Sequence, residues 1–249
     1  MPLSIRQFPC LGDNYGYLVR DAATGRVATV DTPDAEVILA ELKASGWGRL
    51  DHVFNTHWHP DHAGGNARLQ AETGCTIIGP QEVTRIAPLD EVVAGGDEVT
   101  LGETTFHILD VGGHTLGHVA WWSPQADVAF VGDSLFVMGC GRMFEGTPQQ
   151  FWTSLGRLAD LPPETTVYCA HEYSAANARF ALSVDDEPAV RARAEAIFAA
   201  REMGRPTVPT TVAQELATNP FLRAPQLRPD LDPAAAFAAL RAAKDGFSG

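Results

Sequence analysis

The sequence predicts a layered domain of the α/β or α+β class over residues 1–174, followed by a small helical domain over residues 175–249. In the first part, short extended apolar runs alternate with segments of helical periodicity. In the second part the strand signals fade, and prolines separate segments that are helical. With 249 residues, of which 45% are hydrophobic, the chain is long enough to bury one substantial core and a small appendage.

Short apolar runs bounded by polar or glycine-rich turns indicate the strands of the first domain. Several of these runs end at a polar residue of a metal-binding type, and a strand end is a rigid support for a site. The strands are expected at residues 15–20, 26–30, 50–55, 104–111, 118–122, 128–131 and 166–169.

Capping residues predict where the helices begin and end. Thr32 is expected as the N-cap of a first helix, with Pro33 at its first position and Gly46 as its terminator. A second helix is expected to begin at Thr147-Pro148. The later helices are expected at residues 174–183, 187–203 and 211–217, and after a cap at Asp232-Pro233.

The charge of the chain argues against one class of function. Its formal net charge is -13, with no basic stripe that could release counterions from a nucleic-acid backbone. No run approaches the roughly 18 apolar residues of a membrane span, and the N-terminal segment lacks the regions of a signal peptide. We therefore expect a soluble cytoplasmic protein that acts as a monomer, with neither nucleic acid nor membrane as a partner.

The cysteines indicate a reducing compartment. Cys10, Cys75, Cys140 and Cys169 are widely spaced and form no C-x-x-C pair. A disulfide framework or a thiolate zinc site is therefore not expected. We expect Cys140 and Cys169 to be buried, inert thiols.

The stretch Thr56–His62, T-H-W-H-P-D-H, gathers four residues of metal-ligand types in one short polar turn. Alternate side chains of an extended segment face the same way, so His57 and His59 could approach one ion together. Asp61 and His62 follow the proline bend and would point elsewhere. Four such ligands are hard to seat on a single tetrahedral ion that keeps an open water position. Two neighbouring ions are easier, and they require partners far along the chain.

Three more residues of ligand types follow expected strands: His114, Asp133 and His171. They bring the set to five histidines and two aspartates, in which the carboxylate of Asp133 is available to bridge two cations. Each of them alone would more often be a structural residue, but their occurrence together with the first turn favours a metal site. Three histidines remain. His52 and His107 lie within expected strands, whereas His118 is either an alternative ligand to His114 or a residue that supports it.

The motif T-H-x-H-x-D-H at residues 56–62, with the later histidine, Gly-Asp and His-Glu-Tyr elements, resembles the metallo-β-lactamase superfamily. Finer motifs lie at residues 139–146, 171–173, 219–221 and 241–245, and they resemble those of the hydroxyacylglutathione hydrolases, also called glyoxalase II. The resemblance implies an α+β fold, a four-layer αββα sandwich over residues 1–174 that holds a dinuclear metal site, with a helical substrate-binding domain over residues 175–249.

The resemblance also implies the metals and the reaction. Two divalent ions are expected per chain, with zinc favoured and iron or manganese as alternatives. A hydroxide that bridges them would attack the carbonyl carbon of S-D-lactoylglutathione or a related 2-hydroxyacyl glutathione thioester, the second step of methylglyoxal detoxification. The products are glutathione and the hydroxy acid. The implied ligands are His57, His59 and His114 for the first ion, Asp61, His62 and His171 for the second, and Asp133 as the bridge.

Five further residues are implied to bind the substrate: Arg142, Phe144, Tyr173, Arg241 and Lys244. Arg142 stands where some members have a lysine, and it keeps the charge. Phe144 stands where others have a tyrosine, and it cannot donate a hydrogen bond. Arg241 and Lys244 are three residues apart, so they share a helical face and could hold one carboxylate together. From the residues alone, a solvated basic patch at a helix C-terminus is the alternative.

Two other functions could use the same ligands. One is a different reaction on the same scaffold, such as that of a lactonase, a β-lactamase, or a persulfide dioxygenase with a single iron held by two histidines and one carboxylate. It leaves the cluster of Arg142, Tyr173, Arg241 and Lys244 without a purpose. The other is a non-catalytic binding module stabilised by metal, but structural metal sites are usually closed and rich in thiolates, and this one is neither.

Overall fold

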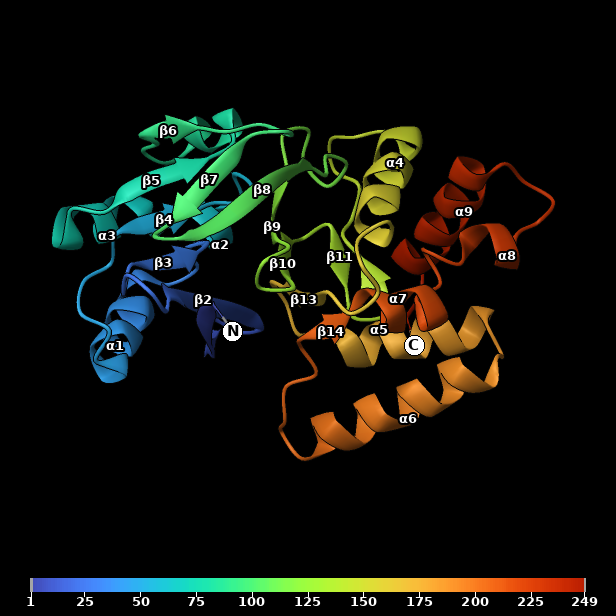
Figure 1. The fold of residues 1–249 in the computed structure, drawn as a ribbon. Coiled ribbons are helices and arrows are strands. Elements are labelled where there is room, and N and C mark those ends of the chain that lie inside the picture. The colour runs from blue at the N-terminus through green and yellow to red at the C-terminus, as the bar shows by residue number, and fades with distance from the viewer. Residues whose placement is uncertain (1, 249) are drawn as a thin grey trace. The chain divides into compact units, whose positions relative to one another are not determined.

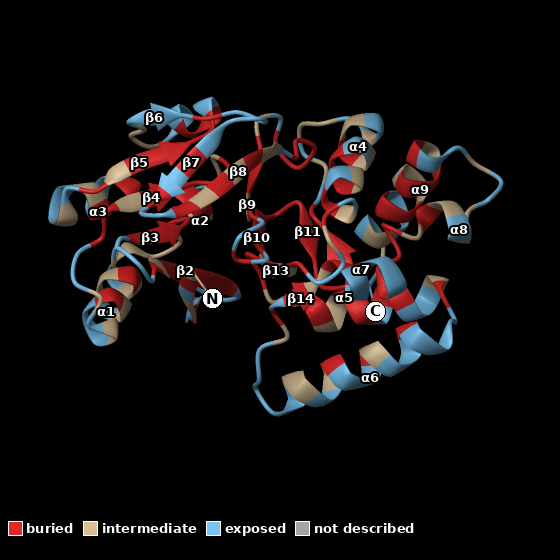
Figure 2. Ribbon diagram, in the orientation of Figure 1, coloured by how far each residue is buried: buried red, intermediate tan, exposed pale blue. Residues whose placement is uncertain are grey.

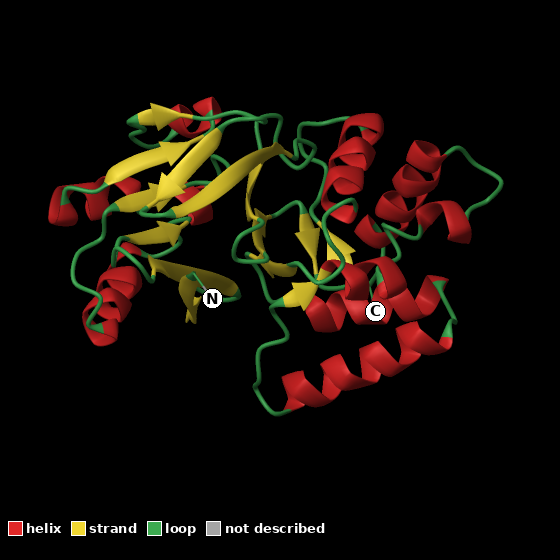
Figure 3. Ribbon diagram, viewed as in Figure 1, coloured by secondary structure: helices red, strands yellow, loops and turns green. Residues whose placement is uncertain are grey.

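The computed structural model describes residues 2–248, which form two compact units. Within the described residues, the first unit comprises residues 2–110 and 117–132, and the second comprises residues 111–116 and 133–248. Strands dominate the first unit and helices the second (Figure 3). The domain boundary expected after residue 174 stays a prediction. Across residues 2–248, no helix is both long enough and apolar enough to cross a membrane.

A six-stranded sheet forms one layer of the first unit (Figure 1). Its strands, in order across the sheet, are β1 (Leu3–Cys10), β2 (Asn14–Asp21), β3 (Val27–Val30), β4 (His52–Phe54), β5 (Thr76–Gly79) and β6 (Glu91–Val92). The first three pair antiparallel and the last four pair parallel. Val30 pairs with Phe54 at the ends of the parallel strands β3 and β4, so the residues that follow these strands lie at one edge of the sheet.

Four more strands of the first unit pair antiparallel in sequence order. They are β7 (Glu98–Leu101), β8 (Thr104–Asp110), β9 (Val119–Ser123) and β10 (Val128–Gly132). They pack on the first sheet through aromatic side chains. Phe54 stacks on Trp121 with ring centroids 4.3 Å apart, and Phe106 meets Phe54 edge-on at 5.6 Å. All three side chains are fully buried, and the ribbon of the first unit has many buried segments, coloured red in Figure 2.

Helices cover the other face of the first sheet. They are α1 (Ala35–Ser45) and α3 (Asn66–Thr73), while α2 (Pro60–Ala63) and the 3-10 helix η1 (Gln81–Arg85) lie in the connections. Ile38 of α1 and Leu69 of α3 share a buried core with Val53 of β4. Val53 and Phe54 are neighbours in one strand and point to opposite faces, so the sheet is apolar on both sides.

The first helix begins later than predicted. Asp34, not Thr32, is the N-cap of α1, because its carboxylate accepts from two backbone N–H groups of the first turn. The predicted cap was wrong because Thr32 is buried and its hydroxyl donates to the side chain of Asn66 at 2.8 Å. Gly46 ends the helix in the left-handed conformation, with a φ of 69°, as predicted.

Helices form most of the second unit, with two short strand pairs (Figure 1). The caps predicted at Thr147 and Asp232 are confirmed, since each side chain accepts from a backbone N–H three residues ahead. Phe237 of the last helix packs edge-on against Phe151 at 5.5 Å in the core of this unit. Its elements are β11 (Leu135–Phe136), β12 (Gly139–Cys140), α4 (Pro148–Ala159), β13 (Thr166–Cys169), α5 (Ser174–Val184), α6 (Pro188–Glu202), β14 (Thr210–Thr211), α7 (Val212–Thr218), α8 (Ala224–Leu227) and α9 (Pro233–Asp245).

Side chains from the helical part hold the β11–β12 hairpin. Glu215 of α7 accepts from the backbone N–H of Met138 at the hairpin tip, where φ is 53°. Asn219 donates to two hairpin carbonyl groups at 3.2 and 2.9 Å, and Asn177 donates to a third at 3.1 Å. These bonds satisfy buried backbone groups and fix the hairpin. The segment that carries Arg142 follows directly.

Candidate active site

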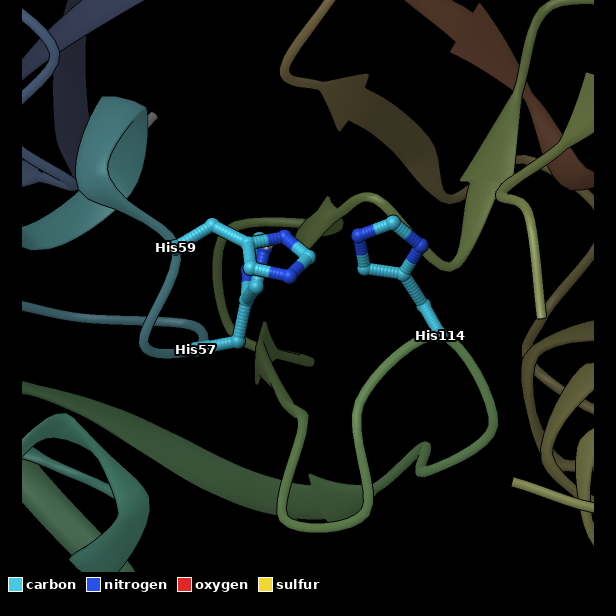
Figure 4. Close-up of side chains that lie close together, drawn as sticks. All are labelled: His57, His59 and His114. Atoms are coloured by element: carbon cyan, nitrogen blue, oxygen red, sulfur yellow. Dashed lines mark hydrogen bonds between the residues drawn. The ribbon is translucent and has the colours of Figure 1, made fainter. Parts of the chain in front are cut away.

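Four residues of metal-ligand types lie in the turn that follows β4, in the first unit. His57 is fully buried, and its Nε2 lies 3.0 Å from Nδ1 of His59, so the two rings face the same region (Figure 4). Asp61 and His62 follow in α2, where Nε2 of His62 lies 3.5 Å from Oδ2 of Asp61. The turn thus presents two pairs of side chains that could bind metal.

Asp31, which the sequence analysis did not single out, orients the side chains of His62 and, through Thr56, of His57. Its carboxylate lies 2.8 Å from Nδ1 of His62 and 2.8 Å from the hydroxyl of Thr56. A carboxylate only accepts, so both groups donate to it. The proton of the Thr56 hydroxyl is engaged there, and its oxygen accepts from Nδ1 of His57 at 3.0 Å. Both histidines therefore carry the proton on Nδ1 and present the Nε2 lone pair, the form that binds a metal.

The three other histidines do not belong to the donor turn. His118 is buried and stacks on His57 with ring centroids 4.5 Å apart, so it supports that ring from behind. His52 stacks on a phenylalanine of its own strand. His107 pairs with Glu98 at 3.3 Å on β7 and β8.

Within the second unit, two imidazoles face one carboxylate. Nε2 of His114 lies 3.4 Å from Oδ2 of Asp133, and Nε2 of His171 lies 3.3 Å from Oδ1. All three side chains are buried. The ring of His114 projects from its loop in Figure 4. Each carboxylate oxygen faces one imidazole, which is the arrangement expected of a bridging ligand.

The donor chemistry of this group fits a divalent cation. Nδ1 of His114 lies 2.7 Å from the carbonyl oxygen of Arg142, which cannot donate, so Nδ1 carries the proton. The Nε2 lone pair then faces the Asp133 carboxylate, and a cation between two such donors satisfies both. Position 141 admits only glycine, because a Cβ at Gly141 would collide with the Asp133 carbonyl oxygen and come within 3.0 Å of His114 Nδ1.

A cavity of about 460 Å³ in the second unit is walled in part by His114 and Asp133. Two aromatic side chains extend this wall. Tyr173 stacks on His171 with ring centroids 4.7 Å apart, and Phe144 stands edge-on to His114 at 5.2 Å while 62% of it is exposed. Three cations line the same cavity: Arg142, Arg241 and Lys244.

Two of these cations have properties that suit an anionic ligand. Arg241 is buried; its Nη1 donates to the carbonyl of Cys140 and its Nη2 to Asp245, both at 2.9 Å. Within the part of the chain that the structure describes, its Nε has no hydrogen-bond partner. The ammonium of Lys244 donates to the carbonyl of Ala176 at 3.0 Å, and burial, together with repulsion from nearby arginines, lowers its pKa. A carboxylate in the cavity would satisfy Arg241 and offset this excess of positive charge.

The thiols near these residues are expected to be unreactive. Burial raises the pKa of Cys140 to about 11, and it raises the pKa of Cys169 further still. The thiolate is the reactive form, and at pH 8 only about one Cys140 in a thousand would carry it. We therefore expect iodoacetamide at pH 8 to spare both residues in the native protein and to alkylate them after unfolding, as mass spectrometry of peptides would show. Alkylation of either residue in the folded protein would contradict their assignment as inert.

Comparisons with known proteins identify the superfamily first. The sequence profile of the metallo-beta-lactamase superfamily matches residues 16–171, more than half of the chain. The crystal structure of ETHE1 from Myxococcus xanthus is 28% identical and aligns with a TM-score of 0.72 over 96% of this chain and 90% of that one. The chain therefore has the metallo-β-lactamase fold, as predicted.

The family follows from the rest of the chain and from close relatives. The profile of the hydroxyacylglutathione hydrolase C-terminus matches residues 172–247. A hydroxyacylglutathione hydrolase of Erythrobacter litoralis is 55% identical over 98% of this chain and 100% of its own length, and one of Hyphomonas neptunium is 48% identical over 98% of each. The chain belongs to the hydroxyacylglutathione hydrolase family. The predicted family, the α+β fold with its C-terminal helical domain and the class of metal-dependent thioester hydrolase are confirmed.

Proposed function

We propose that this chain hydrolyses S-D-lactoylglutathione and related 2-hydroxyacyl glutathione thioesters to glutathione and the hydroxy acid. The name of its relatives, hydroxyacylglutathione hydrolase, supplies the reaction class. The observation that carries the proposal is the cavity of the second unit, whose wall combines the donors His114 and Asp133 with the cations Arg142, Arg241 and Lys244. Glutathione has two carboxylates, so a cationic cavity beside metal-ligand donors suits its thioesters.

The same proposal assigns the metal ligands. Two divalent ions, with zinc favoured and iron or manganese as alternatives, would lower the pKa of a water toward neutrality and polarise the thioester carbonyl. The contribution of the chain is to hold its donors in the right form: Asp31 fixes the tautomers of His57 and His62. The proposed ligands are His57, His59 and His114 for one ion, Asp61, His62 and His171 for the other, and Asp133 for both.

The proposed binding residues hold parts of the substrate that are remote from the reacting carbonyl. We assign Arg241 and Lys244 to the glycine end of glutathione and Arg142 and Tyr173 to its peptide part, with Phe144 as an apolar wall. The leaving group is a thiolate, and a thiol ionises near a pKa of about 8.5, so it departs without a dedicated general acid. The cations of the cavity would attract an anionic substrate even though the formal net charge of the protein is -13.

The proposal extends to organisation and location. Residues 1–174 would form the metal domain and residues 175–249 the substrate-binding domain, and both Arg241 and Lys244 lie in α9 within the latter. We place the protein in the cytoplasm as a monomer with no nucleic acid or membrane partner. The four cysteines form no disulfide within the described residues, which supports a reducing compartment.

The direct test uses the purified protein loaded with zinc. It should release glutathione from S-D-lactoylglutathione, lose that activity to a chelator, and contain two ions per chain by metal analysis. Failure to release glutathione from a protein that holds two ions would overturn the proposal. Hydrolysis of a lactone or a β-lactam in its place would favour another reaction of the superfamily.

The cations of α9 provide a prediction about binding. Lys244→Gln and Arg241→Gln should each raise KM for S-D-lactoylglutathione by about 10–100-fold and leave kcat within about threefold, because hydrogen bonds to charged groups contribute about 1.5–3 kcal/mol. Lys244→Gln is the cleaner variant, since Arg241 also holds the Cys140 backbone. Arg228→Gln, on an exposed arginine, should change neither constant. Steady-state kinetics decide the matter, and a fall in kcat at constant KM would contradict the assignment.

A further inference from the structure

We propose that Asn14 positions Asp61 for metal binding. Asn14 suits this role because its side chain donates a hydrogen bond and carries no charge. The inference rests on the proposed function, which makes Asp61 a metal ligand. Nδ2 of Asn14 donates to Oδ2 of Asp61 at 3.0 Å, across 47 residues of sequence and within the first unit. Asn14 touches this carboxylate and is not itself one of the proposed ligands.

The fold holds Asn14 firmly. It is the first residue of β2 and faces Cys10 across the β1–β2 hairpin, in which eight residues of each strand are paired. The turn is tight, with Leu11 in the left-handed region at a φ of 49°. The Asn14 side chain is buried, with 6% of the residue exposed. A buried amide on a paired strand end can hold its partner at one place.

Asp61 needs such a contact. It lies in α2, a helix of only four residues, and 36% of its side chain is exposed. A carboxylate in a short, half-exposed turn has several rotamers, whereas a metal requires one. The hydrogen bond from Asn14 selects the rotamer in which Oδ2 lies 3.5 Å from Nε2 of His62. That nitrogen presents its lone pair, because Nδ1 of His62 donates to Asp31.

The neutrality of Asn14 matters for affinity. A lysine or an arginine at this position would orient Asp61 as well, but its charge would oppose the approach of a dication. A carboxylate would repel Asp61. An amide donates a hydrogen bond without adding charge, so the full negative charge of Asp61 remains available to the ion.

Asn14→Leu tests this inference because it keeps the approximate volume and removes the donor. We expect the zinc-loaded variant to release an ion at a chelator concentration about 10–100-fold lower than the wild type does, the range typical of residues that orient metal ligands. A colorimetric zinc indicator follows the release, so the readout does not depend on hydrolysis. For the thioester, kcat should fall while KM stays within about threefold, since the cavity of the second unit is unchanged.

Thr104→Val is the matched control. The Thr104 hydroxyl is a buried neutral donor to a different carboxylate of the first unit, that of Asp21, at 2.8 Å. This variant should release zinc as the wild type does. Thermal unfolding of the metal-free proteins checks folding, and Asn14→Ser, whose side chain is too short to reach Asp61, carries the test if the leucine variant does not fold.

Two outcomes would overturn the inference: zinc retention by the Asn14 variants equal to that of the wild type, or an equal loss of zinc in Thr104→Val. The proposed function fails separately. A wild-type protein that binds zinc and does not hydrolyse the thioester would count against that function, whereas the comparison of zinc release between variants would still decide the role of Asn14.

Discussion

Asp133→Asn should reduce thioester hydrolysis by at least about 10³-fold, because a bound ion stabilises the transition state by several kcal/mol and each 1.4 kcal/mol or so changes a rate tenfold. The two oxygens of Asp133 face His114 and His171 at 3.4 and 3.3 Å, the position of the proposed bridge. The substitution keeps the shape of the side chain and removes the charge that would attract the two proposed ions. Metal analysis of the same variant should show fewer than two ions per chain.

The control for this prediction makes the same change at an aspartate that belongs to no group of candidate metal ligands among the described residues. Asp160 is the exposed C-cap of α4, and Asp160→Asn should keep both activity and metal content. Activity near that of the wild type in Asp133→Asn would contradict the bridging role. Full metal content with lost activity would show that the carboxylate acts on the substrate and not on the ions.

The strands that precede the proposed ligands were predictable from two patterns: β10 is buried along its length, whereas β8 and β13 alternate buried and partly exposed residues. The runs expected at residues 104–111, 128–131 and 166–169 correspond to β8 (Thr104–Asp110), β10 (Val128–Gly132) and β13 (Thr166–Cys169). A continuous apolar run or a period-two alternation indicates a strand, so a polar residue of a ligand type directly after it stands out. Side-chain alternation likewise predicts that His57 and His59 face one way, and their nitrogens lie 3.0 Å apart.

Asp31 and Asn14 were not predictable in this way, because their roles depend on how strands pair. Asp31 reaches Thr56 only because β3 and β4 are parallel neighbours that end together. Without that pairing, an aspartate between a strand and a Thr-Pro pair has the pattern of a turn or cap residue. Its φ of 57° is a sign of a special position, but only the backbone geometry reveals it.

The last helix also shows which features of the site the sequence can predict and which it cannot. Helical spacing predicts that Arg241 and Lys244 share one face, and both residues line one cavity. Spacing could not indicate how deeply Arg241 is buried. The residue is only 5% exposed, and it donates to the carbonyl of Cys140, 101 residues earlier in the chain. A periodic pattern identifies a face, whereas burial of a charged residue depends on long-range partners such as this carbonyl and Asp245.

Arg193→Met should cause a large loss of stability, because it leaves a buried carboxylate without its cation. Arg193 of α6 pairs with Glu215 of α7, whose side chain is fully buried. Glu215 also accepts from the N–H of Met138 and from the side chain of Asn219, so it cannot turn toward water without breaking those bonds. Removing one partner of a buried ion pair costs about 3–5 kcal/mol. Urea unfolding of the metal-loaded protein measures the change.

A second substitution separates charge from hydrogen bonding. Arg193→Met combined with Glu215→Gln should be less destabilised than Arg193→Met alone, since the amide oxygen still accepts from Met138 and no buried charge remains. Arg228→Met, which breaks an exposed pair, should leave stability unchanged. Equal losses in the single and double variants would assign the effect to the hydrogen bonds of Arg193 instead. Because Glu215 also fixes the β11–β12 hairpin, KM for the thioester should rise in Arg193→Met below its unfolding transition.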